Sequence, residues 1–170
     1  MIRIILAAAM ALPSLALAQP AAPPPPACAS PEHRQFDFWV GRWQVSPTGK
    51  PAVVAESLIE RLYGGCAIRE HWMPKANPGG GSLNSYVPAE KAWRQTWVGS
   101  SGERVEFKGG VAGGAMVLTG DWPGPDGKSR LVRMTYTKAA DGSVRQLGEQ
   151  SLDGGKTWGP SFDFTYRPAP

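Results

Sequence analysis

Polar side chains on otherwise apolar strand faces are the residues best placed to do chemistry in this sequence. Glu70 shares a predicted strand face with Trp72, and Gln95 shares one with Trp93 and Trp97, because these residues are two positions apart. If these faces point inward, a few polar groups converge among aromatic rings, which is typical of sites for small, partly apolar molecules. The residues predicted to line such a site are Glu70, Trp72, Asn84, Tyr86, Gln95, Trp97 and Arg133.

The two charged residues of this set allow more than one interpretation. Glu70 and Arg133 would pair if both point inward, because isolated buried charges are costly. In an enzyme, Glu70 would be a general acid or base, with Tyr86 and Arg133 orienting an anion. Alternatively, the polar groups only satisfy one another inside a filled barrel. An error of one residue in strand register would instead turn all of these side chains towards solvent.

Motifs for catalysis, metals or cofactors give no further support to an enzyme. The two histidines, His33 and His71, are accompanied by no HExxH motif, no paired-histidine cluster and no Ser-His-Asp constellation. His33 falls in a predicted helical turn, where it is expected to be exposed. His71 is a candidate haem ligand, but a surface or hydrogen-bonded histidine is favoured because no haem-binding signature surrounds it. We therefore expect no catalytic residue, no metal site and no cofactor.

Turn residues divide the chain into strand-length segments that alternate in hydrophobicity. Glycine, proline, asparagine and aspartate clusters provide the breaks. Each segment has one apolar face, as a sheet curled around its own interior requires. A β-sandwich fits less well because it needs longer crossings. The sequence predicts an all-β fold, a single antiparallel β-barrel of about ten strands. These lie near 41–46, 52–63, 66–73, 82–88, 92–98, 103–109, 115–121, 129–138, 143–151 and 161–167.

A short N-terminal helix is expected to close one end of this barrel. Ser30 would cap the helix, and Pro31 would take its first position. The helix would end near Trp39, where Gly41 turns the chain into the first strand. Residues 36–43 read FDFWVGRW, and this density of aromatic residues is typical of the mouth of a small barrel.

The first residues of the chain predict export. Residues 1–18 combine Arg3, an apolar run and an Ala-Leu-Ala site, as in a signal peptide cleaved before Gln19. The run is shorter than the roughly 20 residues that span a bilayer, so a membrane-embedded protein is not expected. Residues 19–29 are interpreted as a proline-rich linker and residues 30–170 as one β-barrel domain. The expected location is periplasmic or secreted, in a Gram-negative bacterium.

Charge and cysteine content narrow the expected partners. The net charge of +4 comes from basic residues scattered beside acidic ones. Without a basic stripe, nucleic acid is not an expected partner. Cys28 and Cys66 are the two cysteines of the chain, and a disulfide between them is the default in an exported protein. The remaining alternative is an envelope interaction module that binds a partner protein through exposed aromatic residues or an open edge strand.

Several motifs together resemble a known family. They are FDFWVGRW at 36–43, GCAIREHW at 65–72, SLNSY at 82–86, WRQTWV at 93–98 and SLDGGKTW at 151–158. This series is similar to an uncharacterised family of exported bacterial proteins that share an FDFWxGxW start and resemble the calycin (lipocalin-like) barrels. The similarity extends over most of residues 32–167. It implies a lipocalin-like barrel and assigns no activity.

The last of these motifs also matches the Asp-box of sialidases. Propeller enzymes repeat this box in every blade, whereas this chain has one copy. A turn-stabilising role is therefore favoured over glycosidase chemistry. Asp153 is expected to accept hydrogen bonds from turn amides while Trp158 packs behind it.

Overall fold

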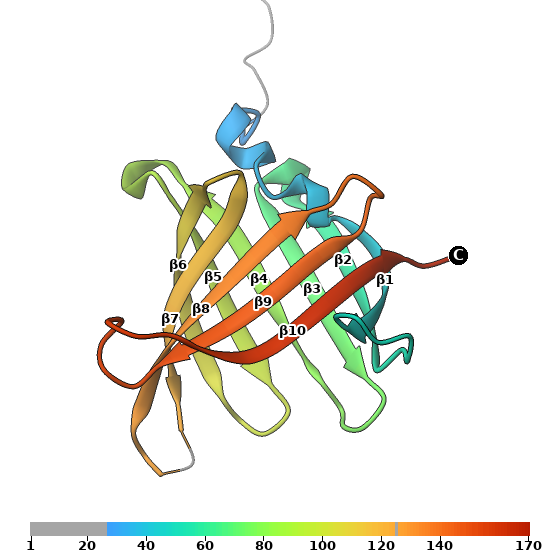
Figure 1. Cartoon of the computed structure of the whole chain (residues 1–170). Coiled ribbons are helices and arrows are strands. Elements are labelled where there is room, and N and C mark those ends of the chain that lie inside the picture. Colours follow the sequence, from blue (N-terminus) through green and yellow to red (C-terminus); the bar gives the residue numbers. More distant parts are fainter. Residues whose placement is uncertain (1–26, 125) are drawn as a thin grey trace, which may run out of the picture.

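Ten antiparallel strands close into a barrel in the computed structural model, which describes residues 27–124 and 126–170 (Figure 1). Each strand pairs with the next along the chain, and the first pairs with the last to complete the barrel. The predicted all-β barrel is confirmed. The strands are β1 (Gly41–Pro47), β2 (Ala55–Leu62), β3 (Ala67–Pro74), β4 (Gly80–Val87), β5 (Ala92–Gly99), β6 (Arg104–Ala112), β7 (Ala115–Pro123), β8 (Ser129–Lys138), β9 (Val144–Ser151) and β10 (Gly159–Pro168).

Alternation along the strands fills the interior with one apolar face from each. Val105 and Phe107 on β6 are buried, whereas Glu106 between them is exposed. Gln95 on β5 is 2% exposed and Glu70 on β3 is 6% exposed, so both point inward. The predicted facing of these two polar residues is therefore right.

The N-terminal plug, residues 28–40, closes one end of the barrel (Figure 1). It forms two 3₁₀ turns, η1 (Pro31–Arg34) and η2 (Asp37–Trp39), rather than one continuous helix. Phe36 lies between the turns at φ −105° and ψ 5°, which interrupts helical geometry. The short connections η3 (Tyr63–Gly65) and η4 (Pro88–Glu90) join strands at the same end.

Aromatic packing seats the plug in the barrel. Phe36 and Trp39 are both 0% exposed, and their stacked rings are 4.8 Å apart between centroids. The Trp39 ring lies 4.9 Å from Tyr136 and 6.2 Å from Tyr166, which point inward from β8 and β10. The aromatic residues of the FDFW motif thus form the sealed end of the core.

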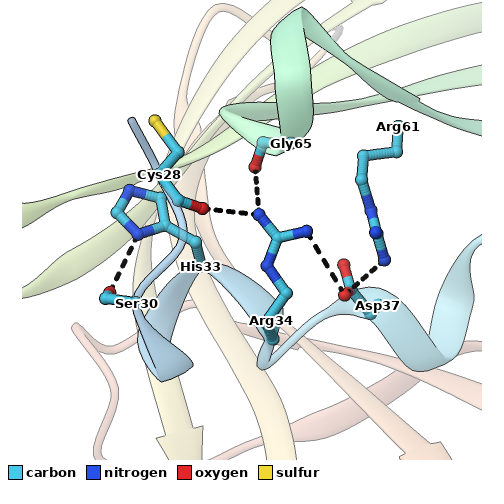
Figure 2. Close-up of polar contacts among 7 residues, drawn as sticks. All are labelled: Cys28, Ser30, His33, Arg34, Asp37, Arg61 and Gly65. Atoms are coloured by element: carbon cyan, nitrogen blue, oxygen red, sulfur yellow. Dashed lines mark hydrogen bonds and ion pairs between the residues drawn. The ribbon is translucent and has the colours of Figure 1, made fainter. Parts of the chain in front are cut away.

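The disulfide predicted between Cys28 and Cys66 is present and ties the plug to the start of β3. Arg34 strengthens this attachment. Its guanidinium donates to the carbonyl oxygens of Cys28 and Gly65, at 2.5 Å and 3.0 Å (Figure 2). Gly65 has φ +96°, and a Cβ there would collide with that guanidinium, so the position requires glycine.

Ionic contacts complete the attachment of the plug. Asp37 lies between Arg34, at 3.7 Å, and Arg61 of β2, as Figure 2 shows.

The prediction that His33 is exposed is wrong, because its side chain is 8% exposed. Its Nδ1 lies 2.9 Å from Ser30 Oγ, and its ring packs edge-on against Tyr86 at 5.3 Å. His33 is therefore a packing residue of the plug.

The single Asp-box stabilises the hairpin between β9 and β10, as predicted. Asp153 Oδ1 accepts hydrogen bonds from the amides of Lys156 and Thr157, at 3.0 Å and 2.9 Å. A hydrogen bond from the Thr157 hydroxyl, followed by those from the Thr157 amide and the Ser151 hydroxyl, lowers the pKa of Asp153 to about 2. The Trp158 indole donates to the carbonyl of Gly155 at 3.1 Å. In this protein the motif stabilises a turn.

The predicted signal peptide, residues 1–18, lies outside the described residues, as does most of the predicted linker. In the part of the chain that the structure describes, no helix is long and apolar enough to cross a membrane.

Candidate functional site

A cavity of about 130 Å³ lies in the half of the barrel away from the plug. Its walls are aromatic and its floor is more polar. The collar, formed by half-buried rings near the strand ends, consists of Trp72, Trp97, Trp122, Phe162 and Phe164. The floor consists of Glu70, Gln95, Met134, Tyr136, Gln146 and Tyr166.

The structure brings part of the predicted site together. Glu70, Trp72, Gln95 and Trp97 line the cavity, as their shared strand faces predicted. Asn84 is 0% exposed and lies behind the floor, where its Oδ1 accepts from Gln95 Nε2 at 2.6 Å. It positions Gln95 without lining the cavity.

Tyr86 and Arg133 lie elsewhere. Tyr86 packs against His33 at the sealed end of the barrel. Arg133 is on the outer face of β8, where it donates to Glu149 at 2.9 Å and stacks over the Trp158 ring at 4.1 Å. An inward pair between Glu70 and Arg133 is therefore wrong. The inward residues of β8 are Val132, Met134 and Tyr136, so Arg133 and Leu131 share the outer face.

Several lining residues were not among the predicted ones. Tyr166, Phe164 and Phe162 alternate on β10, and that signal was visible in the sequence. The sequence does not indicate which strands face one another across the interior of the barrel. Gly148 of β9 leaves room for Phe162, because a Cβ there would collide with the Phe162 ring. The remaining additions are Trp122, Met134, Tyr136 and Gln146.

His71 points away from the cavity. It lies on β3 between Glu70 and Trp72, so its side chain is exposed on the outer face. Haem binding inside the barrel through His71 is excluded by this orientation.

All seven tryptophans lie in the described residues, and none is exposed. Barrel closure also leaves none of the ten described strands as an open edge.

Glu70 is the charged residue of the cavity, and hydroxyl groups hold its carboxylate. Ser82 Oγ donates to Oε2 at 3.0 Å, and Ser57 Oγ donates to Oε1 at 3.5 Å. Among the described residues, no lysine, arginine or histidine lines the cavity or pairs with Glu70. Burial without a cation raises the pKa of Glu70 from its ordinary value of 4.5 to about 7.

A chain of hydrogen bonds crosses the floor opposite Glu70. The Tyr166 hydroxyl donates to Gln146 Oε1 at 2.6 Å, and Gln146 Nε2 donates to the Tyr136 oxygen at 3.0 Å. Tyr136 in turn contacts the sulfur of Met134 at 3.5 Å. Burial and the nearby Glu70 raise the pKa of both tyrosines, so both remain neutral. Their donors are committed within the protein.

The elevated Glu70 pKa predicts a pH dependence of stability. Between about pH 4.5 and pH 7 the unfolded chain loses the Glu70 proton while the folded protein keeps it. The free energy of unfolding contributed by this group therefore falls as pH rises through that window, by about 3 kcal/mol, and is constant above it.

The measurement compares urea unfolding of the wild type and Glu70→Gln from pH 4.5 to pH 8. Glutamine keeps the shape and does not titrate, so subtracting its curve removes the contributions of all other groups. A difference between the two proteins that stays flat over this range would contradict the elevated pKa.

The chain matches no protein-family model. A search of curated proteins likewise finds no similar sequence. The fold and the cavity define the class of protein. It is a closed antiparallel β-barrel, sealed at one end, with a small aromatic-lined cavity over a polar floor. Barrels of comparable strand number either fill their interior or enclose one small ligand.

Proposed function

We propose that this protein binds a small, partly apolar molecule in the barrel cavity and does not transform it. The observation that carries the proposal is the aromatic collar above a floor that contains a buried, ionisable Glu70. A protein interior is normally packed without such space, and a buried carboxyl in an apolar cavity lowers stability. Retaining both is typical of a binding site.

The cavity volume sets the size of the ligand. At about 130 Å³ it is close to the roughly 150 Å³ of an apolar protein cavity that binds benzene. A single ring or a short branched chain fills this space. We propose that the ligand is met in the periplasm or outside the cell. The disulfide supports an oxidising compartment, and the N-terminal sequence pattern is that of an export signal.

The relation to the calycin barrels is also a proposal. The closed antiparallel barrel supports it, as do the FDFWxGxW residues that supply the plug and the start of β1.

The test begins with protein purified from the periplasm without refolding. Native mass spectrometry identifies a retained molecule, and calorimetry measures binding of monosubstituted benzenes. Trp97→Ala removes part of the collar and is expected to weaken binding at least about tenfold. Leu83→Ala, at an exposed outer position of β4, is the control and is expected to bind like the wild type. The absence of any bound species, or wild-type affinity in Trp97→Ala, would overturn the proposal.

An enzyme is the second candidate, because the pKa of about 7 suits Glu70 to acid–base catalysis. Tyr86 and Arg133, the residues expected to orient an anion, lie outside the cavity. Incubating the wild type and Glu70→Gln with one small-molecule extract separates the two functions. An enzyme depletes a compound only when Glu70 is present, whereas a binding protein returns its ligand unchanged.

A further inference from the structure

We propose that the cavity selects a small organic amine, whose ammonium group pairs with Glu70 while its apolar part lies within the aromatic collar. This inference rests on the proposed ligand-binding function and specifies the chemical class of the ligand.

The charge of the cavity favours an amine. Glu70 is 6% exposed, and the described residues that line the cavity include no group of opposite charge. Breaking or omitting one half of a buried ion pair leaves the other charge uncompensated, which is costly. A ligand ammonium supplies the missing half. An anionic ligand would instead place two negative charges in the same small space.

The hydrogen-bond donors and acceptors of the cavity also favour an amine. A carboxylate accepts about four hydrogen bonds, and Glu70 receives one good bond from Ser82 and one long bond from Ser57. Acceptor capacity therefore remains. The floor donors are already committed: Gln95 to Asn84, and Tyr166 to Gln146. An ammonium group, which only donates, matches this surplus of acceptors.

The aromatic collar favours a cation as well. Faces of tryptophan and phenylalanine rings attract a cation within about 6 Å of their centroids. Trp72 and Phe164 lie together above the floor with centroids 5.7 Å apart, and Trp97 and Trp122 with centroids 6.4 Å apart. Rings of this kind around one carboxylate favour a cation with apolar substituents over a neutral molecule of the same shape.

The pairing also predicts how binding depends on pH. The groups that face Glu70 are Ser57 on β2, Ser82 on β4, Gln95 on β5, and the neutral tyrosines Tyr136 and Tyr166. None of these titrates between pH 5 and pH 8. Only ionised Glu70 pairs with an ammonium, so affinity rises with pH up to about pH 7 and then levels off.

The experiment titrates three probes of one size by calorimetry: benzylamine, benzyl alcohol and benzoate. At pH 8 the amine is expected to bind at least about tenfold more tightly than the alcohol, and benzoate most weakly. Lowering the pH to 5.5 is expected to weaken amine binding by about thirtyfold, since most of Glu70 is then protonated. Binding of the alcohol is expected to change little.

Two matched variants identify the responsible carboxylate. Glu70→Gln is expected to remove both the preference for the amine and its pH dependence. Glu149→Gln removes the same charge from the outer face, beside Arg133, and is expected to keep both. If the alcohol or benzoate binds as tightly as the amine, or Glu70→Gln keeps the preference, the amine inference is overturned and ligand binding stands. If no probe binds, the proposed function fails with it.

Discussion

Replacing Trp39 with alanine is expected to lower the free energy of unfolding by about 3–5 kcal/mol, the range typical of a buried tryptophan. The side chain is 0% exposed and contacts the rings of Phe36, Tyr136 and Tyr166. Its indole nitrogen has no hydrogen-bond partner, so the loss comes from packing alone. The cavity left behind lies at the junction of plug and barrel, where neighbouring strands cannot collapse to fill it.

Urea unfolding followed by circular dichroism measures this effect. Leu152→Ala, at a side chain that is 78% exposed, is the control and is expected to change stability by less than about 0.5 kcal/mol. Trp39→Phe keeps an aromatic ring and is expected to fall between the two. If Trp39→Ala is as stable as Leu152→Ala, the plug does not contribute to the core.

Removing the disulfide is expected to lower the free energy of unfolding by a similar amount. Cys28 and Cys66 are 38 residues apart in sequence. Closing a loop of that length lowers the conformational entropy of the unfolded chain, which raises its free energy by about 4 kcal/mol. In the Cys28→Ser/Cys66→Ser double variant, the backbone amides of the plug should also exchange their hydrogens with solvent faster. The Arg34 hydrogen bonds would then be the remaining link between the carbonyl groups of residues 28 and 65.

Unfolding with and without dithiothreitol tests this prediction. Wild-type protein should shift to the stability of the double variant on reduction, and the double variant itself should not respond to the reductant. Equal stability of oxidised and reduced wild type would mean that packing and the Arg34 contacts hold the plug unaided.

The sequence predicted the barrel because its signals are local. Alternation and turn residues lie within a few positions of one another, and they located every strand. The largest boundary errors are at the start of β2, expected at 52 and found at Ala55, and at the end of β6, expected at 109 and found at Ala112. At the end of β6, Gly109 and Gly110 both stay paired with β7. A Cβ at Gly109 would collide with the Val117 carbonyl, so glycine there permits close strand approach rather than a turn.

The cavity was only partly predictable because it depends on contacts between distant strands. Glu70 and Gln95 could be placed inward from their own alternation. The inward residues of β8 could not, since apolar Leu131 lies on the outer face and suggested the opposite orientation for Arg133. His33 was misplaced for a related reason: its burial comes from Tyr86, which is 53 positions further along the chain and adjacent only in the fold.

Tyr136 and Tyr166 touch Trp39 on one side and line the cavity on the other. They form a common wall between the sealed end and the binding space. A coupling carried through this wall would act equally in both directions, because linkage between two equilibria is reciprocal. An effect of reducing Cys28 and Cys66 on the affinity of the cavity would then equal the effect of cavity occupancy on the stability of the disulfide.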